Sequence, residues 1–313
     1  MTAVARARTA LGTLVRRATA PAATPVPSGF RAGSDGGMPD RDGGPWVFDS
    51  GVCREAHFHM PLFAAWCRRL KEPLRVHRKL WEFVYIAQVL EERGALAPGA
   101  RGVGFGVGRE PLAALFASLG ADVLATDVDA EAAVEAGWVR THQHAASLAE
   151  LNDRGICDTA HFDARVRYRT VDMNAVPDDL RGFDFCWSSC ACEHLGSIEQ
   201  GLAFLRRSLD VLRPGGIAVH TTELNLTSPT RTIDHGSTVL FRRPDLESLV
   251  AALRGDGHQA SPVDFAFGAD AIERYIDLPP YRAEPHLRVA LAGKVRWYET
   301  TSVGLVFVKG GEP

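Results

Sequence analysis

The stretch from Arg101 to Glu110 reads RGVGFGVGRE and places glycine at positions 102, 104, 106 and 108. An apolar, helix-like run from Pro111 to Leu119 follows it. A backbone that turns this tightly without side chains can approach a bound nucleoside closely. The stretch therefore predicts a strand-to-helix turn that holds a nucleotide-like cofactor.

The order of residues narrows the type of cofactor. The dinucleotide fingerprint G-x-G-x-x-G fails, because Val107, Arg109 or Pro111 stands at its last position when the count starts from each of the first three glycines. No Lys-Ser or Lys-Thr follows a G-x-x-x-x-G, which excludes a P-loop. The apolar run 121–125 closes on Asp127 and Asp129, where an acid commonly binds ribose hydroxyls. We expect a nucleoside cofactor without a pyrophosphate.

The motifs that follow complete a familiar order. They are VDMN at 171–174, the segment 183–189 and LRPGG at 212–216. With the glycine turn and Asp127, residues 98 to 225 resemble the class I S-adenosylmethionine-dependent methyltransferase superfamily. The resemblance implies S-adenosylmethionine as cofactor. It also implies a Rossmann-like seven-stranded α/β sheet, mostly parallel with an antiparallel last strand, and with helices on both faces.

One position departs from the family pattern. The family often carries an acid two residues before the first glycine of its G-x-G-x-G, and here that position is Gly102. We expect the amino group of the cofactor's methionine part to be held by backbone carbonyls or by another acid.

Apolar segments predict strands at 101–105, 122–126, 165–171, 183–188 and 216–221, with helices at 110–119, 130–151 and 197–211 between them. Such alternation is typical of a parallel sheet covered by helices. Upstream, Glu55 to Glu92 reads as two helices broken near Pro73. Downstream, we expect an amphipathic helix at 244–254 and the last two strands at 263–267 and 303–308.

These elements predict three parts. Residues 1–45 are expected to be a disordered tail and linker, 46–97 a helical cap, and 98–313 the methyltransferase domain. A lid insertion is expected at about 269–300, because some thirty-five residues between the last two expected strands are too many for a hairpin. The basic start of the tail resembles either a transit peptide or the loose tail of a high-GC bacterial sequence.

Composition limits the class of protein. The chain of 313 residues has a net charge of -3 and a pI near 6.4, which argues against nucleic acid as substrate. Its six cysteines lack paired C-x-x-C spacing, so they are expected to be reduced thiols in a cytoplasmic protein. No apolar run reaches eighteen residues, so we expect no membrane segment. The sequence indicates no oligomeric state.

The resemblance assigns cofactor contacts to residues at the ends of the first, second, third and fourth strands. These residues are Gly104, Phe105, Gly106, Gly108, Asp127, Val128, Asp172, Met173 and Ser189. Asp127 is expected to accept both ribose hydroxyls. Asp172 is expected to bind the adenine amine or to cap a helix. From the upstream helix, His77, Arg78 and Trp81 are candidates to close over the cofactor, although Trp81 fits a core position equally well.

The segment Ser188 to Leu195, SSCACEHL, follows the fourth strand, at the edge where substrate and cofactor meet in open α/β sheets. In-line methyl transfer needs alignment and removal of the acceptor's proton. His194 is the first candidate base, or else a structural histidine. Glu223 and His235 are further catalytic candidates after the fifth strand, and Asn225 is a candidate to orient the acceptor.

A metal-assisted alternative stays open. The Glu193-His194 pair is similar to one that ubiquinone-pathway O-methyltransferases use near a divalent ion, and Glu223 points to the same edge. The further acid of those enzymes is Cys190 here. Our first interpretation has no metal, with Glu193, His194 and Glu223 as the alternative ligands.

The sequence thus predicts an S-adenosylmethionine-dependent methyltransferase acting on a small molecule or short peptide. Oxygen is preferred over nitrogen or carbon, because His and Glu bases suit a hydroxyl that must lose a proton. A sugar or natural-product hydroxyl comes first and a carboxylate next. A nicotinamide-dependent oxidoreductase and a catalytically silent S-adenosylmethionine-binding partner protein are the alternatives.

Overall fold

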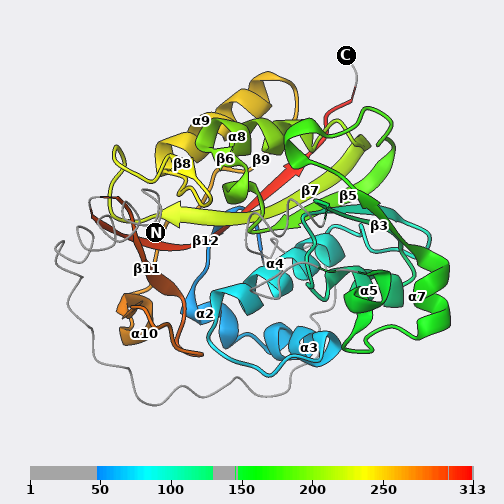
Figure 1. The fold of residues 1–313 in the computed structure, drawn as a ribbon, viewed down its shortest axis with the longest axis horizontal. Helices are drawn as coiled ribbons and strands as arrows, with labels where there is room; N and C mark the ends of the chain where they lie inside the picture. The colour runs from blue at the N-terminus through cyan, green and yellow to red at the C-terminus, as the bar shows by residue number, and fades with distance from the viewer. Residues whose placement is uncertain (1–47, 130–144, 146, 295, 312–313) are drawn as a thin grey trace, which may run out of the picture.

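A ten-stranded sheet forms the centre of the computed structural model, which describes residues 48–129, 145, 147–294 and 296–311 (Figure 1). Eight strands run in the order β10-β11-β12-β7-β5-β2-β3-β4, and β1 and β9 add to β12. Their bounds are β1 Gly51–Val52, β2 Arg101–Phe105, β3 Asp122–Asp127, β4 Val166–Thr170, β5 Phe183–Ser189, β7 Leu212–Asn225, β9 Gln259–Ala260, β10 Ile276–Asp277, β11 Arg288–Ala292 and β12 Trp297–Val308.

Strand direction follows the predicted arrangement. The strands β4, β3, β2, β5 and β7 are parallel neighbours, and β12 lies antiparallel between β7 and β11. A mostly parallel sheet with an antiparallel last strand is therefore confirmed.

The expected count of seven strands is wrong. On the edge away from β7, β11 pairs with β12 only from Trp297 to Thr300. Beyond that point β12 would present unpaired backbone groups, and the two-residue strands β1 and β9 pair with it at Val303 and Phe307. Buried backbone groups need such partners, which explains the two extra strands. The third addition, β10, pairs with β11.

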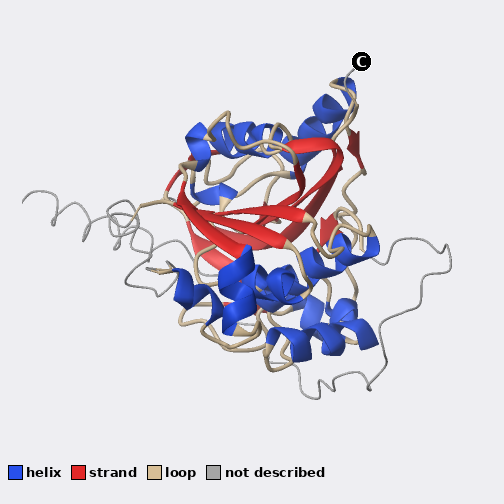
Figure 2. Cartoon of the chain, turned by 90° about the vertical axis from the view of Figure 1, so that its right-hand side faces the viewer, coloured by secondary structure: helices blue, strands red, loops and turns tan. Residues whose placement is uncertain are grey.

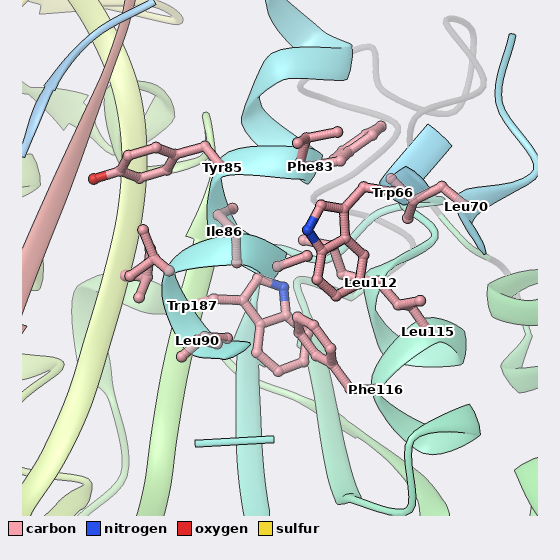
Figure 3. Close-up of a cluster of buried hydrophobic side chains, with 14 of the residues drawn as sticks. Trp66, Leu70, Phe83, Tyr85, Ile86, Leu90, Leu112, Leu115, Phe116 and Trp187 are labelled. Atoms are coloured by element: carbon pink, nitrogen blue, oxygen red, sulfur yellow. The ribbon is translucent and has the colours of Figure 1, made fainter. Parts of the chain in front are cut away.

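Helices cover both faces of the sheet, as expected (Figure 2). On one face lie α3 Pro61–Leu70, α4 Arg78–Glu92, α5 Leu112–Ser118 and α7 Thr159–Arg165; on the other lie α8 Ile198–Arg207 and α9 Arg243–Gly255. Each face of the sheet has its own apolar core, and the side chains of β5 point alternately into the two cores. Phe185 and Trp187 face α5, whereas Cys186 faces α8. Figure 3 shows Trp187 packed against Phe116 of α5 in the core on that face of the sheet.

The remaining short elements lie in the connections. They are α2 Glu55–Phe58, α10 Ala271–Arg274, the 3-10 helices η1 Leu148–Asn152, η2 Met173–Ala175 and η3 Cys192–His194, and the antiparallel pair β6 Gly196–Ser197 and β8 His235–Gly236. No described helix has the length and apolar character needed to span a bilayer.

Most predicted elements are confirmed, including the helical pair, which is broken between Leu70 and Arg78. The helix α7 was not predicted. The expected helix at 130–151 lies largely outside the described residues, as does the whole tail 1–45.

The strand expected at 263–267 is wrong. Only Asp264 makes a bridge there, to Gly51, while Val263, Phe265 and Phe267 pack half-buried against the core without a partner strand. The penultimate strand of the sheet is β11 instead. The segment 269–300 therefore contributes α10, β10, β11 and the start of β12. The division into domains, with a lid in this segment, stays a prediction.

Candidate active site

A cavity of about 460 Å³ lies at the carboxyl ends of the parallel strands, beside the first turn of α4. This is the edge at which open α/β sheets bind ligands. Ten of the residues named from the sequence as site candidates line it: Arg78, Gly106, Gly108, Asp127, Val128, Met173, Ser189, Glu193, His194 and Glu223. The tertiary structure brings together side chains from β3, β5 and β7 around the glycine turn.

The glycine turn forms one wall of the cavity. Gly106 and Gly108 have φ angles of 60° and 51°, a left-handed conformation that favours glycine. A Cβ atom on Gly106 would lie 2.8 Å from the Cβ of Ala191 and 3.2 Å from the Sδ of Met173. The turn thus approaches the loop after β5 with bare backbone, which forms a cradle that a side chain would fill.

Two of the predicted contacts, Gly104 and Phe105, belong to the sheet and not to the cavity lining. The ring of Trp187 covers Gly104, since a Cβ there would lie 2.3 Å from its Cζ2. Phe105 packs edge to face against Phe204 of α8, with ring centroids 5.3 Å apart.

Asp127 links β3 to the glycine turn. Its Oδ2 accepts a hydrogen bond of 2.8 Å from the backbone N–H of Gly108, and its Oδ1 accepts one of 2.8 Å from Val128. The carboxylate is buried but lines the cavity. It is therefore held where a ligand hydroxyl can reach it.

Asp172 lies outside the cavity lining. Its exposed side chain caps η2, accepting a 2.8 Å hydrogen bond from the N–H of Asn174. Met173, the next residue, is buried and lines the cavity. Asp172 thus caps a helix, which is one of the two roles expected for it. Its contact with adenine stays a prediction.

Trp81 lies in the core, and His77 is half-buried just before α4. Trp81 is 1% exposed, donates its Nε1–H to His57 Nδ1 at 2.7 Å and stacks on Tyr85. His77 accepts the N–H of Lys79 at the start of α4. The residues of α4 that line the cavity are Arg78, Lys79 and Phe83.

Arg78 and Lys79 belong to a buried charge network. Arg78 pairs with Glu223, and Lys79 Nζ lies 2.6 Å from Glu82 Oε2. Burial by itself would raise the pKa of Glu82, but Lys79 and Arg78 lower it to about 2. Hydroxyl groups complete the network, since Ser302 donates to Glu82 at 2.6 Å. Two cations and two carboxylates thus compensate one another beneath the cavity.

Sequence reasoning missed Lys79 and Glu82. A signal was present, because Glu82 stands three and four residues after two cations on a helix that is otherwise apolar at its centre.

The loop after β5 supplies the other wall. Cys190 takes a left-handed φ of 48°, and its sulfur lies within 4.8 Å of carboxylate oxygens of Glu193 and Glu223. Glu193 is buried and accepts a 3.0 Å hydrogen bond from Thr222 Oγ1. Burial raises the pKa of Glu193; His194 opposes this rise and Glu223 adds to it.

His194 lines the cavity with a defined tautomer. Its Nδ1 lies 2.7 Å from the carbonyl oxygen of Ser237. A carbonyl oxygen only accepts, so Nδ1 carries the proton and Nε2 is the basic nitrogen of the neutral ring.

Two other candidates do not line the cavity. His235 is exposed in β8 and pairs with Asp234 at 3.3 Å. Asn225 stabilises the loop after β7, where its Oδ1 accepts the N–H of Thr227 at 2.8 Å.

The structure brings together a different set of possible metal ligands from the set expected. Among the described residues, the groups close enough to share an ion are Cys190, Glu193 and Glu223, without His194. Arg78 already supplies a positive charge to Glu223, and burial strongly raises the pKa of the Cys190 thiol. An ion bound here would have to replace the Arg78 contact and remove the thiol proton.

Glu110 is a further cavity residue that sequence reasoning missed. It is 8% exposed and accepts a hydrogen bond from Trp187 Nε1. Burial raises the pKa of Glu110 to about 8, although Trp187 and Lys79 act in the opposite direction. Its place directly after the glycine turn was the only signal in the sequence.

Comparison with known proteins finds methyltransferases among the proteins similar to this chain. Residues 102–220 match the protein family described as methyltransferase domain. A malonyl-[acyl-carrier protein] O-methyltransferase of Salmonella typhimurium is 38% identical over 55 residues, which are 18% of this chain and 21% of that protein. The chain therefore spans about a fifth of the length of that relative.

Solved structures similar to this chain include magnesium protoporphyrin IX methyltransferase from Synechocystis, with bound S-adenosylhomocysteine. Its identity is 13% and its TM-score 0.43, over 82% of this chain and 97% of that one. The CcbJ methyltransferase from Streptomyces caelestis is 12% identical with a TM-score of 0.40, over 77% and 98%.

Proposed function

We propose, from the premise that this chain belongs to the class I S-adenosylmethionine-dependent methyltransferase superfamily, that it methylates a hydroxyl group of a small molecule or short peptide. One observation carries the proposal. A bare glycine turn with a buried acid, Asp127, and a basic nitrogen of His194 line the same cavity. The first two suit a nucleoside, and the third suits an acceptor that must lose a proton.

The donor set of the cavity fits the cofactor. Gly106 and Gly108 would lie against its methionine part, and Asp127 would accept its ribose hydroxyls. Met173 and Val128 would flank the adenine ring. The bound cofactor supplies an electron-poor methyl group, and the protein aligns an acceptor with it.

The acceptor side of the cavity supports oxygen as the methylated atom. Arg78 compensates Glu223, and burial favours the neutral form of Glu193, so the site holds little net negative charge to attract a cationic amine. In this proposal His194 removes the hydroxyl proton through Nε2. Glu223, fixed by Arg78 and by Thr300 at 2.8 Å, orients the acceptor. A sugar or natural-product hydroxyl is the first expectation and a carboxylate the next.

The proposal also covers the expected helical cap and the expected lid insertion. Arg78 and Lys79 at the start of α4 and Leu291 of β11 line the cavity. We infer that residues 46–97 and the segment 269–300 select the acceptor. The six cysteines are free thiols, which supports the expected cytoplasmic location.

The test combines binding and turnover. Calorimetry with S-adenosylhomocysteine should show saturable heat, and S-adenosylmethionine with a panel of hydroxylated acceptors should yield S-adenosylhomocysteine. Binding without turnover on any acceptor would favour the catalytically silent alternative. Neither heat nor a thermal shift would reject the proposal, and saturable fluorescence enhancement of NADH would favour the oxidoreductase.

A metal-assisted reaction is the second candidate, favoured by the proximity of Cys190, Glu193 and Glu223. A divalent ion there would lower the pKa of an acceptor hydroxyl. If it is required, treatment with EDTA abolishes turnover and added magnesium, manganese or zinc restores it. Turnover that EDTA leaves unchanged rejects this candidate while leaving methyl transfer itself intact.

A further inference from the structure

Two aromatic rings of β5 lie directly over the bare backbone of β2. A Cβ atom on Gly102 would lie 2.2 Å from Cζ of Phe185, and one on Gly104 would lie 2.3 Å from Cζ2 of Trp187. Real Cβ atoms do not approach other atoms so closely. With Phe185 in this place, the position at which the family often carries an acid therefore has no room for a side chain.

The same aromatic layer positions a different acid. The indole N–H of Trp187 donates to Glu110, which follows the glycine turn and lines the cavity. Glu110 is buried, and Trp187 is the only partner that donates a hydrogen bond to it among the described residues. A buried carboxylate with one neutral donor is under-compensated, so it can gain from a cationic ligand group.

A cation of the protein lies near this acid. Lys79 lowers the pKa of Glu110 by its charge, and its 38% exposed side chain also lines the cavity. Its ammonium group already contacts Glu82, which also accepts from Ser189 at 3.1 Å. An ammonium group has three donors, so Lys79 can bind an anionic ligand group and keep Glu82. The cavity lining thus contains an acid, Glu110, directly after the glycine turn, and a cation, Lys79.

We propose that Glu110 and Lys79 form a clamp for a free amino-acid group, with Glu110 binding the α-ammonium and Lys79 the α-carboxylate of the cofactor's methionine part. The inference rests on the proposed function and deepens it. The acid that cannot stand at position 102 is replaced by Glu110, and the first turn of α4 completes the cofactor site. Each ligand charge would meet an opposite charge, and the pair with Glu110 would form in a buried setting, where such pairs are strong.

Binding should also be linked to a proton. The charged and polar groups facing Glu110 are Lys79 and Glu82 from α4, Asp127 from β3 and Trp187 from β5. Burial raises the pKa of Glu110 to about 8, so its carboxyl is largely protonated near neutral pH in the free protein. A bound ammonium favours the carboxylate. Cofactor binding should therefore release a proton, and affinity should rise as pH rises towards 8.

Calorimetry on the full chain tests the clamp with two ligands that share one nucleoside. S-adenosylhomocysteine carries the amino-acid group, and 5′-methylthioadenosine lacks it. We expect Glu110→Gln and Lys79→Met each to weaken S-adenosylhomocysteine binding by about 10- to 50-fold, the usual loss for a hydrogen bond to a charged group. Binding of 5′-methylthioadenosine should stay within about twofold. Glu247→Gln on the exposed face of α9 is the matched control and should change neither.

A third ligand separates the two roles. The decarboxylated analogue of S-adenosylhomocysteine keeps the ammonium only, so Glu110→Gln should weaken it and Lys79→Met should not. Heats measured in buffers of different ionisation enthalpy should show proton release in the wild type and none in Glu110→Gln.

The possible failures are distinct. If the wild type binds neither S-adenosylhomocysteine nor 5′-methylthioadenosine, the proposed function fails and the clamp with it. If it binds S-adenosylhomocysteine and the two variants bind it equally well, only the clamp is wrong. Equal losses for both ligands would also overturn the clamp, because they indicate general damage to the site.

Discussion

Replacing Arg78 with methionine tests the charge network beneath the cavity. The Arg78 side chain is 15% exposed and pairs with Glu223 and Glu82, whose side chains are 6% and 0% exposed. Its removal leaves Glu82 paired with Lys79 alone and takes from Glu223 the cation with which it pairs. Breaking a buried ion pair from one side costs about 3–5 kcal/mol, because the remaining charge is still buried. We expect the free energy of unfolding to fall by that amount near neutral pH.

The loss of stability in Arg78→Met should be larger at neutral pH than in acid. Burial alone raises the pKa of Glu82, but Lys79 and Arg78 hold it at about 2, below the ordinary 4.5. A carboxyl with a depressed pKa stabilises the fold above its unfolded pKa, and this contribution disappears as pH falls through the folded value. A depression of this size corresponds to about 3 kcal/mol. The effect of Arg78→Met should therefore be full above about pH 5 and shrink as the pH falls towards 2.

Urea unfolding followed by circular dichroism, at neutral pH and in mild acid, measures both quantities. Arg243→Met is the matched control, because its side chain is 63% exposed and pairs with Glu247 on the helix surface. An exposed pair of this kind contributes about 0.5 kcal/mol or less. A loss for Arg78→Met below about 1 kcal/mol, or an equal loss at both pH values, would refute the reasoning.

Three further predictions concern ligand binding and turnover. Asp127→Asn should weaken S-adenosylhomocysteine binding in calorimetry by about tenfold or more; an analogue without ribose hydroxyls should bind both forms equally, and a matching loss for it would contradict the assigned contact. Gly106→Ala and Gly99→Ala both strain a left-handed residue, at φ 60° and 82°, but only Gly106 has an atom within 4 Å of the new Cβ. Only Gly106→Ala should therefore lower cofactor affinity, and equal affinities in the two variants would count against the cradle. His194→Ala should lower kcat by about a hundredfold and His235→Ala should not; a reversed result in steady-state assays would move the base to β8.

Local patterns in the chain predicted much of the fold. The period of apolar residues predicted the parallel strands and their covering helices, since these depend on short stretches of sequence. The glycine turn and Asp127 were predicted for the same reason, because a tight turn and a strand-end acid are local features. The pattern failed at β11, where VDFAF at 263–267 looked more like a strand than the true RVALA did. Pairing with β12 decided between these segments, and pairing is not local.

The sequence by itself determined the class of fold and the type of cofactor turn, because backbone conformation there follows from residue type. Only the tertiary structure decided which polar side chains share the cavity. It placed Trp81 in the core and Lys79 at the cavity, although both stand on the same helix. It brought Glu110 under Trp187, 77 residues away. Burial and charge compensation depend on neighbours distant in the chain, so no local pattern contains them.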